Sequence, residues 1–204
     1  MNEQLLKKVQ SCNIENVMQQ KSYVFFGNGK YNLNLIGIRA KRPNDVNSDK
    51  FEDVLTVIYN DDNLKPVKLI IPITTVPGLS YMKNPANNKG TAILKPGQYR
   101  GVWKIDYHAG KYLALCQRGD KFVVYRDNNR DYILDFDEAT ADYGYFGLNF
   151  HHAGTNSLLV ANWSAGCQVA QKMADFDKVM ILSNKAKALY GNSFTYTLLE
   201  EEDL

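Results

Sequence analysis

Alternation of apolar and polar positions is the dominant pattern after residue 22, and a period of two predicts β-strands. Residues 31–39 alternate between polar and apolar in their first half. They follow an apolar run at residues 23–26 and a turn-forming cluster at residues 27–30, so the two runs predict the strands of a hairpin. Further short apolar runs are separated by turn residues. They predict strands at residues 53–59, 66–73, 99–107, 111–117, 121–126, 132–136, 146–150, 158–163 and 193–199.

Helical spacing is confined to the two ends of the chain. Residues 3–19 carry apolar positions three to five apart and predict a helix that breaks near Asn13. Residues 173–190 predict a second helix, which ends at Gly191. Residues 77–97 lack a period and predict a long surface loop. We therefore expect a mainly β protein: an N-terminal helical extension at residues 1–21 and a single β-rich sandwich or barrel domain at residues 22–204.

Composition and charge narrow the classes of function. The chain has 24 Lys and Arg against 22 Asp and Glu, and this near balance disfavours nucleic acid as a partner. Its apolar runs are shorter than the roughly 20 residues that cross a bilayer, so we expect no membrane insertion. The first residues lack the apolar region of a secretory signal, which predicts synthesis in the cytoplasm. Three widely spaced cysteines do not form a disulfide framework.

Candidate chemistry gathers late in the chain. His151 and His152 directly follow an apolar strand, and Cys167 comes sixteen positions after His151. A thiolate nucleophile needs a base and hydrogen-bond donors for the oxyanion that it creates. His151 is the candidate base, and the N–H groups of Gly166 and Cys167 are the candidate oxyanion donors. The residues alone equally allow Cys167 to be a small buried hydrophobic residue without chemistry.

The same segment resembles a known active-site signature. In the L,D-transpeptidase (YkuD-type) family, a histidine is followed by some 16 to 19 positions and then by Ser/Thr-His-Gly-Cys. The matching residues here are His151, Ser164, Gly166 and Cys167, with twelve positions between His151 and Ser164. Ala165 stands where the family usually has its second histidine. The support that this imidazole gives must therefore come from another residue, such as His152, or the activity must be lower. The resemblance covers about residues 90–199 and includes proteins encoded by bacteriophages.

The resemblance implies an L,D-transpeptidase-like β-sandwich or barrel with an N-terminal and a C-terminal helix. It implies that Cys167 attacks L,D-peptide bonds of peptidoglycan stem peptides, with His151 as its base and no cofactor. It leaves open whether the product is a hydrolysed or a cross-linked stem. Further residues are expected to touch substrate or support the site: His152, Ser164, Asn149, Trp163 and Arg100. For Asn149 the sequence allows two roles: a hydrogen bond to the imidazole of His151 that sets its tautomer, or a polar strand position that faces solvent.

The wall substrate lies outside the cytoplasm, so a cytoplasmic product must be a phage lysis enzyme or a component carried in a virion.

Two other interpretations of the chain remain open. A non-catalytic phage structural or binding protein with a degenerate form of this fold is the alternative, and Ala165 favours it. A zinc site built from His108, His151, His152 and Cys167 is the other. Adjacent strand residues point to opposite faces, so we predict no metal.

Overall fold

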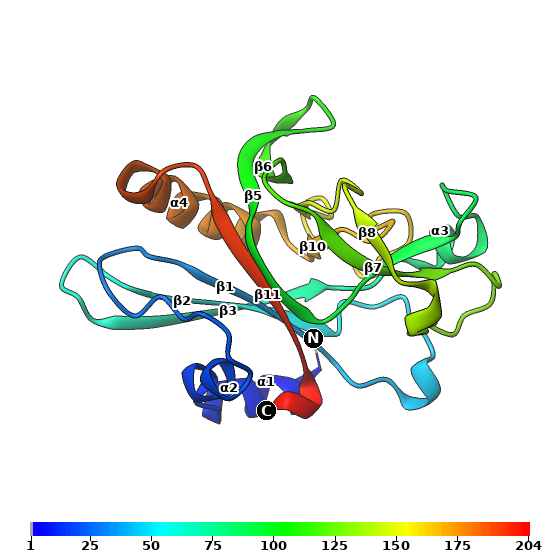
Figure 1. Cartoon of the computed structure of the whole chain (residues 1–204), viewed down its shortest axis with the longest axis horizontal. Coiled ribbons are helices and arrows are strands. Elements are labelled where there is room, and N and C mark those ends of the chain that lie inside the picture. Colours follow the sequence, from blue (N-terminus) through cyan, green and yellow to red (C-terminus); the bar gives the residue numbers. More distant parts are fainter. Residues whose placement is uncertain (1) are drawn as a thin grey trace.

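The computed structural model describes residues 2–204, with 36% of residues in strands and 24% in helices, which confirms a mainly β protein. Eight strands close into a barrel in the order β1-β11-β5-β6-β9-β10-β3-β2 (Figure 1). The barrel strands are β1 (Asn34–Arg39), β2 (Asp53–Asn60), β3 (Pro66–Thr74), β5 (Gly97–His108), β6 (Tyr112–Gln117), β9 (Phe150–His152), β10 (Gln168–Ala170) and β11 (Phe194–Glu200).

A second sheet of three strands lies beside the barrel, in the order β4-β7-β8 (Figure 1). It consists of β4 (Thr91–Leu94), β7 (Phe122–Asp127) and β8 (Asp142–Gly144). The helices are α1 (Glu3–Ser11), α2 (Ile14–Gln20), α3 (Leu79–Lys83) and α4 (Met173–Tyr190), and short 3₁₀ turns occupy Pro43–Asp45, Glu138–Thr140 and Glu201–Asp203. No helix within residues 2–204 combines the length and the apolar character needed to span a bilayer.

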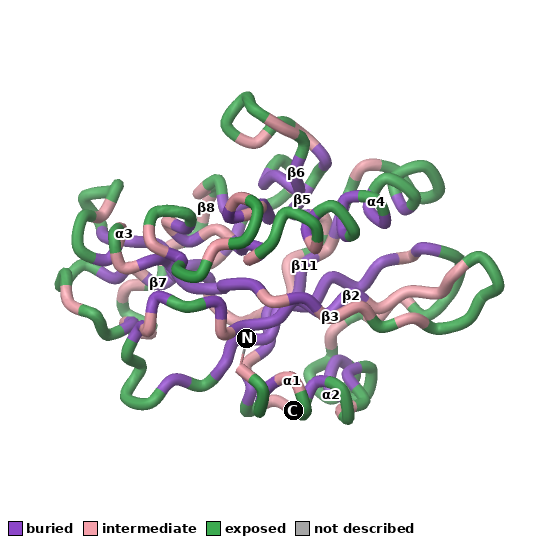
Figure 2. Tube along the Cα trace, turned by 180° about the vertical axis from the view of Figure 1, so that it is seen from behind, coloured by how far each residue is buried: buried purple, intermediate pink, exposed green. Residues whose placement is uncertain are grey.

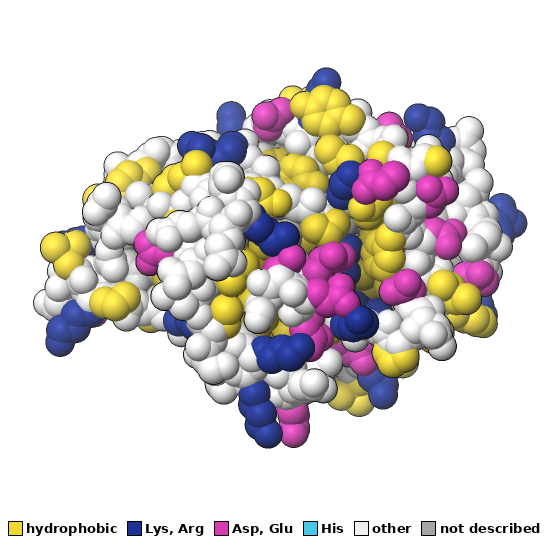
Figure 3. Space-filling view, turned by 60° about the horizontal axis from the view of Figure 1, so that its bottom comes forward, with side chains coloured by type: hydrophobic (Ala, Val, Ile, Leu, Met, Phe, Trp, Pro, Cys, Tyr) yellow, Lys and Arg dark blue, Asp and Glu magenta, His cyan; other side chains and the backbone are white. Residues whose placement is uncertain are grey.

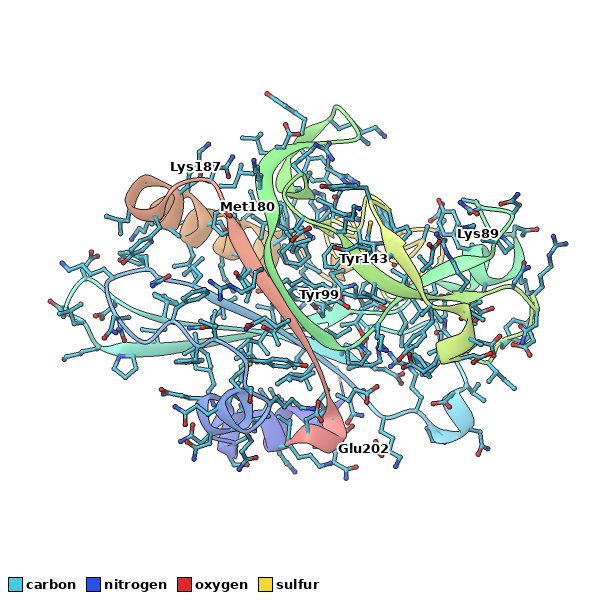
Figure 4. The ribbon with its side chains drawn as sticks, in the orientation of Figure 1. Lys89, Tyr99, Tyr143, Met180, Lys187 and Glu202 are labelled. Atoms are coloured by element: carbon cyan, nitrogen blue, oxygen red, sulfur yellow. The ribbon has the colours of Figure 1, made fainter. Side chains whose placement is uncertain are left out.

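Aromatic and aliphatic side chains fill the barrel, whose strands other than β3 and β5 are buried along most of their length (Figure 2). Trp103 is fully buried and stacks on Tyr196 with 4.3 Å between ring centroids. Helix α4 adds one apolar face to this core, with Met180 turned towards the strands and Lys187 turned to solvent (Figure 4). The helix predicted at residues 173–190 is therefore confirmed, and it ends before Gly191 as expected.

The N-terminal helices cover the outer surface of the barrel. Asn2 caps α1 by accepting hydrogen bonds from Gln4 and Leu5, and Asn13 caps α2, which confirms the predicted break. Buried side chains of both helices pack against outward-facing side chains of the barrel; this cluster includes Leu5, Val9, Ile14, Met18, Ile36, Ile38, Val54 and Leu199. Figure 3 views this side of the molecule, where acidic and basic side chains lie interspersed. Ion pairs such as Lys8 with Glu201 join α1 to the C-terminus.

Four predicted strands are wrong in whole or in most of their length. Residues 23–26, 132–136 and 158–163 form no strand, and of residues 146–150 only Phe150 lies in one. Residues 133 and 159 make isolated bridges to residues 46 and 50, and side chains bind other backbone groups of these segments. Gln98 binds both the N–H and the C=O of Val24. Asp131 accepts from the N–H of Ile133, and Asp49 accepts from the N–H of Ala161. The predicted strands at residues 53–59, 66–73, 99–107 and 111–117 are confirmed, and they pair as the hairpins β2–β3 and β5–β6. The predicted loop at residues 77–97 contains α3 and β4.

Asp127 is a buried carboxylate at the end of β7 with an incomplete set of partners. It is 0% exposed, and its Oδ1 has no hydrogen-bond partner among the described residues. Burial, together with the nearby Asp135 and Asp131, raises the pKa of Asp127 to about 6. Folding therefore favours the protonated carboxyl. The stability that this group contributes is present at low pH and is lost as the pH rises through 6.

We predict that Asp127→Asn increases the free energy of unfolding at pH 8 by on the order of 1–3 kcal/mol, because it removes a charge that the folded state binds poorly. At about pH 4, where the folded wild-type carboxyl is protonated, the difference should largely disappear. Urea unfolding at the two pH values measures it, with the exposed Asp120→Asn as control. Equal stabilities of wild type and Asp127→Asn at pH 8 would contradict the prediction.

Candidate active site

The candidate site forms where β9 and β10 run parallel. Their register places Phe150 opposite Gln168 and His151 opposite Val169. Because side chains alternate along a strand, Phe150 and Gln168 face the barrel interior, where Gln168 binds the hydroxyl of Tyr196. His151 lies on the other face, and so does Cys167, two residues before Val169. The pairing thus brings the two residues that the sequence spacing singled out to the same face of the sheet.

Both residues line one pocket of about 460 Å³. Its walls come from the β5–β6 hairpin, from β9, from α3 and from the segment that precedes β10. The full lining is Tyr81, His108, Ala109, Lys111, Tyr112, His151, His152, Asn162, Trp163, Ala165 and Cys167. Trp163 is 41% exposed, which places it at the rim of the pocket rather than in the core.

Cys167 is a neutral thiol in this pocket. Its Sγ accepts from the backbone N–H of Asn149 at 3.4 Å and donates to the carbonyl oxygen of Gly147 at 3.5 Å. Burial raises the pKa of this thiol to about 11, against the opposing effect of the Asn149 N–H. The thiolate is therefore a minor species at neutral pH, and a base must take the proton during a reaction.

His151 is oriented to act as that base. It is 4% exposed, and its Nδ1 lies 3.1 Å from the carbonyl oxygen of His152. A carbonyl oxygen only accepts hydrogen bonds, so Nδ1 carries the proton and Nε2 keeps its lone pair. Burial, and then the neighbouring His108, lowers the pKa of His151 to about 4. The imidazole is therefore neutral at physiological pH, with a free basic nitrogen.

The thiol and the imidazole share the pocket without a direct bond in the resting state. No hydrogen bond joins the Sγ of Cys167 to His151 among residues 2–204, and the thiol proton is held by Gly147. Proton transfer therefore requires the thiol to turn from Gly147 towards the histidine. The two neutral groups match a mechanism in which charge separates only when a substrate is bound.

The turn before Cys167 depends on Gly166. Its φ is +121°, and a Cβ there would lie 2.5 Å from the carbonyl oxygen of Ala92. Its N–H donates to the Oγ of Ser164, which in turn donates to the carbonyl of Cys167. This differs from the expectation that the Gly166 and Cys167 amides act together on an oxyanion. The Cys167 N–H has no acceptor in the described part of the chain, whereas the Gly166 N–H is already bound.

The other predicted residues have different positions. The hydrogen bond considered between Asn149 and His151 is not formed. Instead, Nδ2 of Asn149 binds Nδ1 of His108 at 3.0 Å. His152 accepts from the N–H of Gly154 and stacks against Tyr112, so it forms a wall of the pocket. Arg100 does not reach the site: it lines a separate pocket near Phe26, because the outward-facing side of β5 carries it there.

His108 is a component that the sequence pattern did not place in this role. It is the last residue of β5, and its ring stacks on that of His151 with centroids 4.3 Å apart and planes inclined by 19°. In the sequence, His108 stood out only as one of three histidines, and the sole role considered for it was that of a zinc ligand. Within residues 2–204, no three His, Cys, Asp or Glu side chains are arranged to hold a metal ion.

Protein-family models, curated proteins and solved structures all give no match to this chain.

We predict that alkylation of Cys167 by iodoacetamide accelerates about tenfold per pH unit from pH 7 to 9, because the thiolate fraction of a thiol with a pKa of about 11 rises tenfold per unit in that range. Peptide mapping by mass spectrometry separates Cys167 from Cys12 and Cys116. A rate that is already constant above pH 7 would contradict the neutral resting pair and indicate a thiolate–imidazolium pair instead.

Proposed function

We propose that this chain is a cysteine-dependent acyl-transfer enzyme that acts on L,D-peptide bonds of peptidoglycan stem peptides. The observation that carries the proposal is a single pocket in which Cys167, a histidine oriented by a backbone carbonyl, and a free main-chain N–H lie together. The resemblance of the segment around His151 and Cys167 to the L,D-transpeptidase signature supplies the substrate class. In this proposal the barrel is a variant of the L,D-transpeptidase-like fold.

The reaction follows from the tautomer of His151. Its Nε2 takes the proton of the Cys167 thiol as sulfur attacks the carbonyl carbon of the diamino-acid residue that precedes a D-amino acid. The N–H of Cys167 donates to the resulting oxyanion. The C–N bond then breaks, and the imidazolium of His151 returns its proton to the leaving amine. A thioester remains on Cys167, and attack by water or by the amine of a second stem releases it.

The carbonyl of His152 makes the base effective. By accepting from Nδ1, it holds the ring in the orientation that presents Nε2 to the pocket, and it stabilises the imidazolium that forms after proton transfer. A buried histidine with a pKa of about 4 is a weak base at rest but a strong acid once protonated. It is therefore well suited to the second half of the step, in which an amine must be expelled.

The charge of the lining fits an acidic substrate. Lys111 is exposed at the tip of the β5–β6 hairpin and adds a positive charge to the pocket, whereas the lining contains no Asp or Glu among the described residues. Stem peptides carry carboxylates next to the bond that is cut, and an ammonium group is a suitable partner for them. Trp163 and Tyr112 offer apolar surface for the aliphatic part of the diamino acid.

The cellular setting follows from the substrate. A wall-acting product of phage origin would reach peptidoglycan either as an endolysin released during lysis or as a virion component, and we propose such a phage-associated role. A non-catalytic wall-binding protein of a phage particle is the alternative. Ala165 in the lining and the engaged N–H of Gly166 favour it, since both remove a group that the family signature provides.

Wild-type protein incubated with purified peptidoglycan and tetrapeptide muropeptides is expected to give new products by liquid chromatography and mass spectrometry. Loss of the terminal D-amino acid or cleavage of cross-links identifies a hydrolase, and cross-linked dimers identify a transpeptidase. We predict that Cys167→Ala lowers the rate by at least about 10³-fold, the usual effect of removing a nucleophile. Cys12→Ala, a partly exposed cysteine next to α1, is the matched control and should keep full activity.

Absence of products with wild-type protein, in a preparation where a positive-control enzyme is active, would rule out the enzymatic proposal. Retention of the inactive wild type on insoluble peptidoglycan would then favour the binding alternative. A large fall in the melting temperature of Cys167→Ala would show that the residue acts in packing.

A further inference from the structure

The hydrogen bonds around His108 define its tautomer. The backbone N–H of Gln117 donates to Asn149 at 2.8 Å, and since an N–H only donates, the Asn149 atom that receives it is the oxygen. The amide nitrogen of Asn149 therefore faces Nδ1 of His108, 3.0 Å away. An amide NH₂ only donates, so Nδ1 of His108 accepts, and the proton of the neutral ring lies on Nε2.

The two stacked imidazoles are consequently opposite tautomers. His151 has its proton on Nδ1, bound to the His152 carbonyl, and presents a basic Nε2. His108 has its proton on Nε2 and presents a donor. Burial, and then His152, Lys111 and Arg118, lowers the pKa of His108 from its ordinary value, which favours the neutral ring. Its Nε2 meets no acceptor in the described part of the protein, and its ring lines the pocket.

We propose that His108 is a further catalytic residue, whose Nε2–H donates a hydrogen bond to the oxyanion formed on attack by Cys167. This inference rests on the proposed function. In this scheme His108 replaces the N–H of Gly166 as the second oxyanion donor, because that N–H is bound to Ser164. It also supplies an imidazole to a pocket in which Ala165 provides none. His108 gives up no proton: it holds the oxyanion while the proton passes between Cys167, His151 and the leaving amine.

Asn149 and Gln117 are positioning residues in this scheme. Asn149 touches the site twice, since its side chain binds His108 and its backbone N–H binds the sulfur of Cys167. It is buried, and its amide is oriented by a backbone group of β6 that does not rotate. The relay from Gln117 through Asn149 thus determines which nitrogen of His108 faces substrate. The stack on His151 fixes the plane of the ring.

Tautomers can be read directly by NMR of the full-length protein with ¹⁵N-labelled histidine. Long-range ¹H–¹⁵N correlations distinguish Nε2–H from Nδ1–H rings, and only three histidines need assignment, by His→Gln variants. At pH 7.5 we expect His108 as Nε2–H and His151 as Nδ1–H. In Asn149→Asp, a carboxylate that only accepts should move a proton to Nδ1 of His108. A wild-type His108 that is Nδ1–H or doubly protonated would overturn the proposal.

Kinetics test the role of the donor. His108→Phe keeps an aromatic ring for the stack but has no N–H, and we predict a fall in kcat of about 10²–10³-fold, the usual effect of losing one oxyanion donor, with a much smaller change in KM. His108→Gln retains a donor and should recover part of the loss. Melting temperatures close to that of wild type establish that both variants fold.

The outcomes separate the two proposals. Wild-type turnover with an unimpaired His108→Phe overturns the donor role and leaves the proposed function standing. Absence of wild-type turnover overturns the proposed function, and the role of His108 in it falls at the same time. A drop in His108→Phe that His108→Gln does not relieve at all would show that a side-chain N–H at this position does not restore activity, which also contradicts donation.

Discussion

The parallel pairing of β9 with β10 is the constraint on which the candidate site depends. These two consecutive three-residue strands are neighbours in the barrel, and their register leaves His151 and Cys167 on the same face. Shifting this register by one residue would turn one side chain into the barrel core, because side chains alternate with a period of two. The buried contact of Gln168 with Tyr196 resists such a shift, since Gln168 would lose its partner.

Gln117 extends this control to the loop that faces the sulfur. Its side-chain oxygen accepts from the backbone N–H groups of Phe146, Gly147 and Leu148, and its own N–H holds Asn149. From the barrel interior, Trp103 donates to the carbonyl of Leu148. A buried amide with all these bonds made is costly to displace, so the loop whose Gly147 carbonyl accepts the hydrogen bond from Cys167 is held in place. The site is thus supported by polar bonds that reach into the core.

Local patterns were sufficient to predict much of the fold. The hairpins of β2 with β3 and of β5 with β6 were readable because their strands are adjacent in sequence and alternate in polarity. The helix Met173–Tyr190 was readable from its spacing and its terminal glycine. Strand β10 was not, because three residues give no period. Residues 132–136 and 158–163 were misassigned because apolar content alone does not reveal that their backbone is bound only by isolated bridges and side chains instead of a continuous ladder.

The candidate site likewise contains residues that the sequence predicted and residues that it did not. The spacing of His151 and Cys167 identified the pair, since both lie within one short stretch of sequence. The contribution of His108 could not be derived, because its proximity to His151 is a product of barrel closure between β6 and β9. The partner of Asn149 was likewise misassigned to the nearest histidine in sequence, whereas packing selects the histidine from β5. Tautomers depend on such tertiary partners, so no local pattern predicts them.

The central claim is that the sulfur of Cys167 forms a covalent bond with the acyl group of a stem peptide. Intact-protein mass spectrometry after rapid acid quenching of the full-length protein with a tetrapeptide muropeptide tests this most directly. The account predicts a mass increase equal to the acyl portion without the terminal D-amino acid, located on the peptide that contains Cys167 and absent from Cys167→Ala. Product formation without any adduct, or an adduct that survives in Cys167→Ala, would contradict it.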